Sequence, residues 1–399
     1  MSKKKILYLT RDGLLEPLGQ SQILSYLVPL SKNYNFHIIS FEKKVDLLDL
    51  KHFEAIKNIC ADNNIEWSVL KYDSEYRVIS ILYGFIKLFF KTFQLCKQNK
   101  FNLIHSRSYY TAFISLFIYK ITNVPFLFDM RALWPEELAE SGRIKKNGYA
   151  WRIVKKLENR CLKNAAAIVS LTHAAVLYLN DVFPNHDIEA KTTVIPTCAN
   201  LTDFNYLDKE VSKSENKIIL SCVGSVLSGW FKLDYLINSM DYILSNYSEI
   251  TFEFITRDDH KIICAKIDAK NKWQDRIKFR SLSFSEMPNT LPNYSGSLFF
   301  FTPNISKLGS APTRMAELLG CGVPVMTNSG VGDVADIVTE NEIGIVIDNL
   351  DEIPACCDKF IDLIKGKVIS KKCRNVALEL FSLDVGVRKY TQAYESVNV

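Results

Sequence analysis

Residues 311–338 combine residue types that can bind an anionic ligand. A helix is expected to begin near Pro312, an apolar strand follows at 323–326, and a glycine-rich turn leads into a second helix. The N-terminus of a helix offers unpaired N–H groups and a partial positive charge, which favour phosphate. Arg314 can form a bidentate pair with phosphate oxygens, and Glu317 lies one turn later on nearly the same face. A cation and a carboxylate that face one ligand suit a nucleotide sugar, through its diphosphate and its ribose hydroxyls.

The same spacing also fits a purely structural helix start. Proline is common at the first position of a helix, and an Arg and a Glu three residues apart often form an ion pair on a helix surface. Spacing alone supports the ligand-binding and the structural interpretation about equally.

The stretch resembles the donor-binding core of family-four retaining glycosyltransferases, in which Pro-Thr-Lys often precedes a Glu and a Gly-x-Pro-Val run. The corresponding residues here are Pro312, Thr313, Arg314 and Glu317, and the resemblance implies that they bind the donor. Four further segments are similar to the polysaccharide-assembling branch of that family, namely residues 15–22, 38–43, 128–131 and 167–172. The resemblance covers nearly the whole chain. It implies an α/β protein of GT-B fold, with two Rossmann-like doubly wound domains that face a central cleft.

The first loop of the second domain departs from the family pattern. Gly224 and Ser225 follow the first strand, and the N–H groups of such a turn can hold an anion, although a tight strand-to-helix connection is the simpler interpretation. Many members have an Arg directly after this glycine and a Lys five residues later, whereas this chain has Ser225 and Trp230. We therefore expect the cationic contacts to come mainly from Arg314, with Lys232 as a further candidate.

A second departure concerns the Glu-x7-Glu pair of the family. Glu317 matches the second Glu, but Gly309 stands at the first position. The hydroxyl of the neighbouring Ser310 can reach a phosphate or a sugar hydroxyl, which makes it the candidate replacement. Because the first Glu usually contacts the sugar ring, the sequence does not identify the transferred sugar.

Three ionisable residues at strand ends of the first half are candidates for catalysis. Asp129 stands where many relatives have a His beside the transferred sugar, and it can stabilise positive charge at the anomeric carbon or orient the acceptor hydroxyl. Arg131 can steady Asp129 or an anionic acceptor, and His105 ends a predicted strand that faces the cleft. The alternative is a buried Asp–Arg pair that fixes the loop, together with a structural His.

The loop after the first strand contains Gly13, Gly19 and Gln20. Its glycines can bring backbone close to the donor phosphate or the acceptor, as the equivalent loop does in relatives. The loop lacks Gly-x-Gly-x-x-Gly, which argues against a dinucleotide cofactor. A purely structural turn is the alternative.

Short β-rich runs alternate with amphipathic stretches along the chain, which is typical of parallel sheets with crossover helices. We expect one series of strands at 6–10, 37–41, 67–70, 102–105, 125–129, 167–171 and 193–195. We expect a second series at 217–223, 252–256, 277–280, 297–301, 323–326 and 345–347. Ligands of such sheets bind at the carboxyl ends of the strands.

The two series predict two domains. We place the hinge after 196–200, in a polar stretch that ends at 212–216. Residues 1–200 are then the acceptor-binding domain, residues 201–380 the donor-binding domain, and residues 381–399 a C-terminal helix. The resemblance implies that this helix crosses back to the first domain.

Composition narrows the class of protein further. At 399 residues with 48% hydrophobic residues, the chain is long enough for two cores. The ten cysteines include no Cys-x-x-Cys and no Cys/His spacing suited to zinc, and no Asp-x-Asp occurs. We therefore expect a reduced, cytoplasmic setting and no bound metal. Neither a signal-peptide pattern nor a nucleic-acid-binding signature is visible.

Basic residues are concentrated in the first half of the chain. Residues 1–200 carry 27 Lys and Arg against 18 Asp and Glu, while residues 201–399 carry 22 against 26. No Asp or Glu occurs from 76 to 128, where the basic residues are Arg77, Lys87, Lys91, Lys97, Lys100, Arg107 and Lys120. Residues 79–93 are too short and too basic to span a bilayer, but they suit a helix that lies on an anionic membrane surface. A crossover helix buried against the sheet is the alternative.

The residues and the resemblance together favour a metal-independent retaining glycosyltransferase of the hexosyltransferase type. We expect it to move a sugar from a UDP- or GDP-linked donor to a surface glycan, such as capsule or lipopolysaccharide, or to a lipid-linked saccharide. The helix dipole and Arg314 would stabilise the leaving diphosphate, and no separate cofactor is expected. No residue resembles a dedicated nucleophile, which favours front-face displacement. The alternatives are a nucleotide-sugar epimerase of GT-B fold and a non-catalytic nucleotide- or glycan-binding protein.

Overall fold

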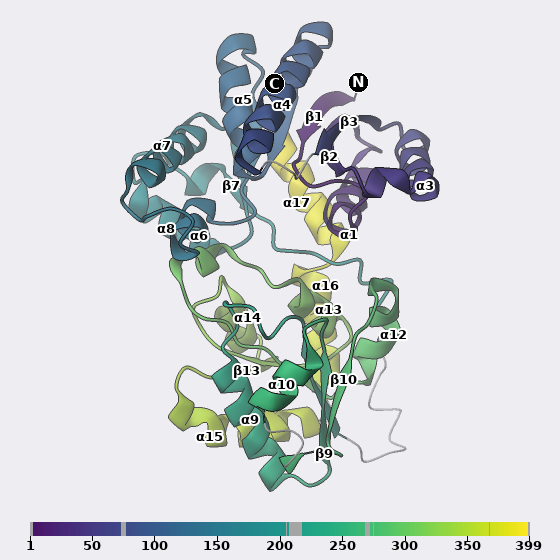
Figure 1. Cartoon of the computed structure of the whole chain (residues 1–399), viewed down its shortest axis with the longest axis vertical. Coiled ribbons are helices and arrows are strands. Elements are labelled where there is room, and N and C mark those ends of the chain that lie inside the picture. Colours follow the sequence, from purple (N-terminus) through teal and green to yellow (C-terminus); the bar gives the residue numbers. More distant parts are fainter. Residues whose placement is uncertain are drawn as a thin grey trace. The chain divides into compact units, whose positions relative to one another are not determined.

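The computed structural model describes residues 3–72, 77–204, 206, 218–267, 272–273, 275–366 and 368–397; the predicted hinge segment at 212–216 lies outside them. The chain divides into two compact units, each built on its own sheet (Figure 1). The N-terminal unit comprises Met1–Pro196, Leu308–Ser310 and Gly386–Val399, and the C-terminal unit comprises Thr197–Lys307 and Ala311–Val385.

The sheet of the N-terminal unit has seven parallel strands in the order β3-β2-β1-β4-β5-β6-β7. The strands are β1 (Lys4–Leu9), β2 (Tyr34–Lys43), β3 (Glu66–Tyr72), β4 (Leu103–Arg107), β5 (Phe126–Asp129), β6 (Ala167–Ser170) and β7 (Thr192–Val194). Strands β4, β5 and β6 are buried along their whole length, as expected for parallel strands covered on both faces. The order reverses between β1 and β4, so a crevice is expected at the carboxyl ends of these two strands.

The sheet of the C-terminal unit has six parallel strands in the order β10-β9-β8-β11-β12-β13. The strands are β8 (Ile218–Val223), β9 (Ile250–Ile255), β10 (Ile277–Arg280), β11 (Gly296–Leu298), β12 (Val325–Thr327) and β13 (Gly344–Val346). Here the order reverses between β8 and β11. The two sheets confirm the predicted class of two doubly wound α/β domains.

Helices connect successive strands in both units, and further helices follow the last strand of the C-terminal unit. In the N-terminal unit they are α1 (Pro17–Gly19), α2 (Ser25–Leu30), α3 (Leu50–Asp62), α4 (Arg77–Gln98), α5 (Ser108–Thr122), α6 (Trp134–Glu140), α7 (Tyr149–Asn164) and α8 (His173–Val182). In the C-terminal unit they are α9 (Leu233–Asn246), α10 (His260–Lys266), α12 (Met287–Thr290), α13 (Thr313–Gly320), α14 (Val334–Glu340), α15 (Ile353–Lys365) and α16 (Ile369–Leu380). Helix α17 (Leu383–Glu395) follows, and its residues from Gly386 onward belong to the N-terminal unit.

Helix α4 is the longest helix described and packs beside α5 (Figure 1). Its inward face contributes Leu88 and Leu95 to the core of the N-terminal unit. Within the described ranges, no helix is both long enough and apolar enough to cross a membrane.

The loop after β1 is held by close packing of its glycines. A Cβ on Gly13 would lie 2.9 Å from the carbonyl oxygen of Phe41 and would overlap with the carboxylate of Glu42. A Cβ on Gly19 would overlap with the carbonyl oxygen of Gly13. Both positions therefore require glycine because no space exists for a side chain.

This packing predicts that Gly19→Ala destabilises the N-terminal unit. Because the overlap is with backbone, the loop must shift, and we expect a loss of about 3 kcal/mol, at the upper end of the usual cost of overpacking. Thermal unfolding of the purified variant measures the loss.

Gly229→Ala is the matched control. Nothing lies within 4 Å of a Cβ at Gly229, so this variant should unfold within about 0.5 kcal/mol of wild type. Equal stability of the two variants would contradict the tight packing described for the loop.

Candidate functional site

The three residues predicted to carry chemistry in the N-terminal unit lie together near the carboxyl ends of β4 and β5. Asp129 is the last residue of β5, Arg131 follows it, and His105 lies on the neighbouring β4. Arg131 Nη1 is 3.8 Å from Asp129 Oδ1, and His105 Nε2 is 3.4 Å from Asp129 Oδ2. The structure thus joins the three residues in one charged cluster.

Two residues that the sequence analysis did not select complete this cluster. Arg107, the last residue of β4, is buried, and its Nη1 lies 3.8 Å from Asp129 Oδ2. Its Nε lies 3.4 Å from Oδ2 of Asp12, which follows β1 across the point where the strand order reverses. A basic residue at a strand end was visible in the sequence, but nothing local distinguished Arg107 from the nearby His105.

Asp129 is a buried carboxylate that its neighbours keep ionised. Burial by itself raises the pKa of Asp129, but Arg131, His105 and Arg107 outweigh it and bring that pKa down to about 2. The hydroxyl of Tyr390 on α17 also donates to Asp129 Oδ2 at 2.9 Å. The side chain of Asp129 has no exposed surface, which places it behind Arg131 and not at the surface of the crevice.

The contacts of His105 determine its protonation state. Burial lowers the pKa of His105, although the Asp129 carboxylate opposes that shift, so the imidazole is neutral at pH 7. A carboxylate can only accept, so His105 Nε2 carries the proton and donates it to Asp129. The other nitrogen, Nδ1, then accepts from the hydroxyl of Tyr394 at 2.8 Å. Both nitrogens are occupied, so His105 orients Asp129 instead of acting as a free base.

Three polar atoms of this cluster have no hydrogen-bond partner among the residues described: Arg107 Nη1, Arg131 Nη1 and Asp129 Oδ1. Arg131 also has a φ of 57°, a left-handed conformation that is strained for a residue with a side chain. Unpaired buried polar atoms and local strain are both typical of functional sites. Two donors and one acceptor are the set that a hydroxyl group can satisfy, since a hydroxyl both accepts and donates.

The predicted loop residues Gly13, Gly19 and Gln20 take part in the structure of the loop itself. The N–H groups of Leu14 and Leu15 donate to the carboxylate of Glu42, at 2.8 Å and 3.1 Å. Gln20 Nε2 lies 3.2 Å from the carbonyl oxygen of Leu15 and 3.1 Å from His52 Nε2. The N–H groups that could have faced a ligand thus bind a carboxylate of the chain, and contact of this loop with substrate stays a prediction.

The corresponding loop of the C-terminal unit binds a carboxylate in the same way. Gly224 has a φ of 127°, which favours glycine, and Ser225 follows it. Asp258 Oδ2 accepts from the N–H groups of Val226 and Leu227 at 2.7 Å and 2.9 Å, and Ser225 Oγ donates to Asp258 Oδ1 at 2.8 Å. Burial raises the pKa of Asp258, but these hydrogen bonds lower it by more. The turn binds the carboxylate of Asp258, and contact of Gly224 and Ser225 with the donor stays a prediction.

Helix α13 carries the predicted donor residues of the C-terminal unit. It begins at Thr313 after Pro312, and Arg314 forms an ion pair with Glu317. The Arg314 side chain is 34% exposed, whereas the Glu317 side chain is 3% exposed. Burial raises the pKa of Glu317, and Arg314 opposes that rise. Arg314 can therefore reach a ligand at the start of α13, while Glu317 lies beneath it.

One of the two departures from the family pattern, Gly309, has a structural explanation. A Cβ on Gly309 would lie 2.9 Å from the backbone nitrogen of Leu133, so a Glu does not fit at this position. Ser310 belongs to the N-terminal unit and precedes the segment that leads to α13. The ammonium of Lys232 lies 3.4 Å from the centre of the Tyr235 ring, which holds it near the start of α9.

Comparison with known proteins shows the fold. No protein-family model matches the sequence, and no curated protein matches it. Among solved structures, HepE (Alr3699) from Anabaena with UDP and glucose is 15% identical, with a TM-score of 0.68 over 98% of this chain and 100% of that chain. A glycosyltransferase from Rickettsia africae is 16% identical, with a TM-score of 0.70 over 100% and 99% of the two chains. Sucrose-phosphate synthase from Thermosynechococcus elongatus is 12% identical, with a TM-score of 0.69 over 99% of both. The predicted GT-B fold is thereby confirmed.

The occupied turn of the C-terminal unit yields a prediction about Asp258. Asp258→Ala frees two N–H groups and one hydroxyl, so an added anion no longer competes with a carboxylate of the chain. We expect inorganic diphosphate to bind about tenfold more tightly, because hydrogen bonds to a charged group contribute about 1.5–3 kcal/mol. Calorimetric titration with diphosphate measures the change.

Asp259→Ala is the control, because this substitution removes the same charge at a residue outside the turn. Asp259 instead caps α10 by accepting from the N–H group of Lys261. Diphosphate affinity that changes equally in the two variants would show that the turn does not bind the anion.

Proposed function

We propose that the protein is a retaining glycosyltransferase that moves a sugar from a UDP- or GDP-linked donor to a surface-glycan or lipid-linked saccharide acceptor. The observation that carries this proposal is the Arg314–Glu317 pair at the start of α13. Helix α13 follows β11, one of the two strands between which the order reverses, so its N-terminus belongs to the edge where doubly wound sheets bind ligands.

The donor would bind the C-terminal unit through its diphosphate and its ribose. We assign the diphosphate to Arg314 and the N-terminus of α13. We assign the ribose hydroxyls to Glu317, which would become accessible when Arg314 turns from it to the phosphate. Pro312, Thr313, Ser225 and Gly224 would line the same site, and Ser310 would contact the sugar. HepE, whose fold this chain shares, was solved with UDP-glucose, which supports a nucleotide diphosphate sugar as the donor.

The chemistry would rest on electrostatic stabilisation of the departing diphosphate. The positive charges at Arg314 and at the α13 N-terminus stabilise the transition state most strongly, because negative charge forms on the leaving group there. This arrangement supports a reaction without a metal ion, and we propose a hexose as the transferred sugar. Asp129 is too deeply buried to attack a sugar, which favours front-face displacement over a covalent intermediate.

The N-terminal unit would bind the acceptor through Arg131. Asp129 and His105 are then positioning residues, because they hold the guanidinium while neither is exposed to a ligand. The Nη1 of Arg131, which has no hydrogen-bond partner among the described residues, would donate to the acceptor hydroxyl.

The donor assignment predicts that Arg314→Ala weakens UDP or GDP binding by about 1.5–3 kcal/mol, the contribution of hydrogen bonds to a charged group. A thermal-shift screen with nucleoside diphosphates identifies the base, and calorimetry then measures the affinity. Arg314→Lys keeps the charge but loses the bidentate geometry, so its affinity for the nucleoside diphosphate should lie between those of wild type and Arg314→Ala.

Lys359→Ala is the charge-matched control, on an exposed position of α15. Unchanged diphosphate affinity in Arg314→Ala would place the phosphate site elsewhere. Donor incubated without acceptor then tests the alternatives, because an epimerase converts the donor sugar and a binding protein leaves it unchanged.

We also propose that α4 and α5 place the N-terminal unit on an anionic membrane surface. Tyr76 lies outside the described residues, as do the side chains of residues 77–81. Beyond them, the large apolar side chains that α4 and α5 leave exposed are Leu82, Tyr83, Ile86, Phe90, Phe117 and Ile121. Helix α4 is thus a crossover helix with one face in the core, and its other face is apolar as well.

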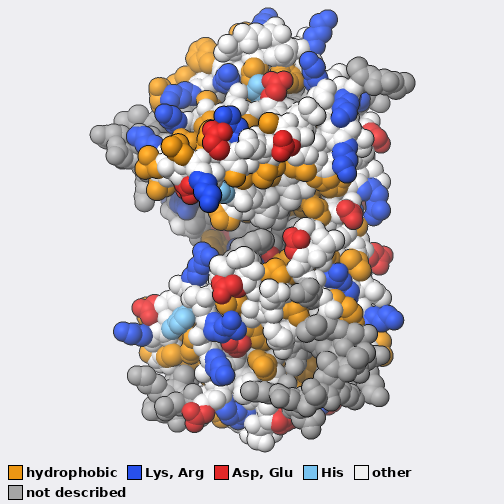
Figure 2. All heavy atoms as spheres, turned by 90° about the vertical axis from the view of Figure 1, so that its right-hand side faces the viewer, with side chains coloured by type: hydrophobic (Ala, Val, Ile, Leu, Met, Phe, Trp, Pro, Cys, Tyr) orange, Lys and Arg blue, Asp and Glu red, His pale blue; other side chains and the backbone are white. Residues whose placement is uncertain are grey.

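The charged residues of α4 and α5 are all basic. Lys87 and Lys97 lie over the rings of Tyr83 and Phe93, at 4.2 Å and 5.6 Å from the ring centres, and no acidic residue occurs from 82 to 122. Such side chains are typical of proteins that bind a membrane surface. Their rings enter the interface, and their ammonium groups contact the phosphates of the lipid head groups. On the face of the N-terminal unit drawn in Figure 2, exposed apolar side chains lie among both basic and acidic ones.

Replacing Lys87, Lys91 and Lys97 by Glu should release the protein from anionic vesicles. Each lysine near an anionic surface contributes about 1 kcal/mol, so the triple variant loses at least 3 kcal/mol. Co-sedimentation with phosphatidylglycerol vesicles measures binding, and circular dichroism checks the fold.

Lys261, Lys278 and Lys359 are exposed in the C-terminal unit, and their triple replacement by Glu makes the same change of charge. If wild type, variant and control sediment equally, the α4–α5 surface does not bind lipid.

A further inference from the structure

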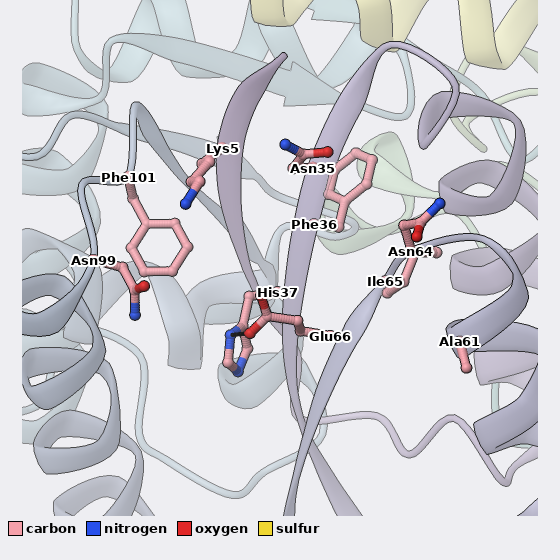
Figure 3. A pocket seen from close by; sticks show the side chains of 10 residues that line it. All are labelled: Lys5, Asn35, Phe36, His37, Ala61, Asn64, Ile65, Glu66, Asn99 and Phe101. Carbon is pink, nitrogen blue, oxygen red and sulfur yellow. Dashed lines mark ion pairs between the residues drawn. The ribbon is translucent and has the colours of Figure 1, made fainter. Parts of the chain in front are cut away.

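A pocket of about 450 Å³ lies in the N-terminal unit at the amino ends of β1, β2 and β3. Its lining comes from β1, β2, the end of α3, the start of β3 and the segment between α4 and β4 (Figure 3). Strand β1 has six residues, so roughly 20 Å separates this edge from the charged cluster at the carboxyl ends. The pocket is therefore a separate place on the molecule, which neither the proposed donor site nor the acceptor site uses.

Several polar groups of this pocket are not used by the fold. Among the described residues, the ammonium of Lys5 and the carboxamides of Asn35 and Asn64 have no hydrogen-bond partner. Asn99 Nδ2 donates to the carbonyl oxygen of Leu95 at 3.5 Å, and its Oδ1 remains available as an acceptor. Lys5 and Asn35 are paired in register on β1 and β2, and Figure 3 shows the Lys5 side chain extending toward Phe101.

A contact with His37 holds one further acceptor in the pocket. His37 Nδ1 is 2.9 Å from Glu66 Oε2, and His37 Nε2 is 2.8 Å from Ser68 Oγ. His37 is buried and fully engaged, whereas the Glu66 side chain is 78% exposed and retains a second carboxylate oxygen. His37 thus orients Glu66, which presents an acceptor to any bound molecule.

An aromatic ring borders these polar groups. Phe101 lies edge-on to His37, with 6.3 Å between ring centres, and is only partly buried. A ring beside carboxamides, an ammonium and a carboxylate offers an apolar face together with both donors and acceptors. Among the lining residues, Lys5 and Glu66 carry opposite formal charges, so the lining has no net formal charge while His37 is neutral.

We infer that this pocket binds a neutral saccharide unit. A sugar ring has one apolar C–H face for Phe101 and several hydroxyl groups, each of which donates and accepts, for Asn35, Asn64 and Glu66. The volume lies within the usual range of small-ligand sites. The inference stands on these residues and does not depend on the proposed glycosyltransferase activity.

The test is saturation-transfer NMR of the full chain with methyl glycosides of glucose, galactose, mannose and N-acetylglucosamine. We expect at least one to bind with an affinity in the millimolar range. Asn35→Ala combined with Asn64→Gly should weaken binding at least fivefold. Asn64 has a φ of 53°, so glycine removes its carboxamide without straining the backbone.

Asn238→Ala, which removes an exposed carboxamide in the C-terminal unit, is the control and should bind as wild type does. Nucleoside diphosphate binding should be the same in all three proteins, which separates this test from that of the donor site. The inference is overturned if no glycoside binds at concentrations up to about 50 mM. It is equally overturned if the double variant binds as tightly as wild type.

Discussion

The buried charge of Asp129 is the interaction on which the N-terminal unit depends. A carboxylate in a protein interior is unfavourable unless charges and hydrogen bonds compensate it. Here Arg107 and Arg131 supply the charge, and Tyr390 and His105 supply the hydrogen bonds. The carboxylate therefore ties β4, β5 and α17 to one point, and it fixes the position of the only guanidinium of this cluster that is partly exposed, that of Arg131.

In both units, a carboxylate of the chain accepts hydrogen bonds from the backbone N–H groups of the loop after the first strand. A turn after the first strand leaves N–H groups without partners in the sheet, and such groups must be satisfied. Glu42, near the end of β2, satisfies Leu14 and Leu15, and Asp258, just after β9, satisfies Val226 and Leu227. In each case the acid comes from the neighbouring parallel strand, so it orders the loop whether or not a ligand is present.

The sequence predicted the fold better than it predicted the site. Parallel strands buried on both faces appear as apolar runs, and every predicted strand is found within a few residues of its expected place. The start of α13 was equally visible, because Pro312 marks it locally. The partners of the charged residues were not: Tyr390 is 261 residues from Asp129, and Tyr394 is 289 from His105. Only the fold makes these residues neighbours, and only burial then makes His105 neutral and Asp129 ionised.

The contact of Tyr390 with Asp129 has a consequence for the order in which the chain is made. Translation proceeds at about 5–20 residues per second, so roughly 10–50 s pass between the synthesis of Asp129 and that of Tyr390, 261 residues later. Once β7 has been synthesised, the chain contains all seven strands of the N-terminal sheet, but it still lacks Tyr390 and Tyr394, whose hydroxyl groups bind Asp129 and His105. The N-terminal unit thus reaches its final form only after the C-terminal unit has been synthesised. The N-terminal unit is built from separate segments of the chain, and these segments also become available for folding at separate times.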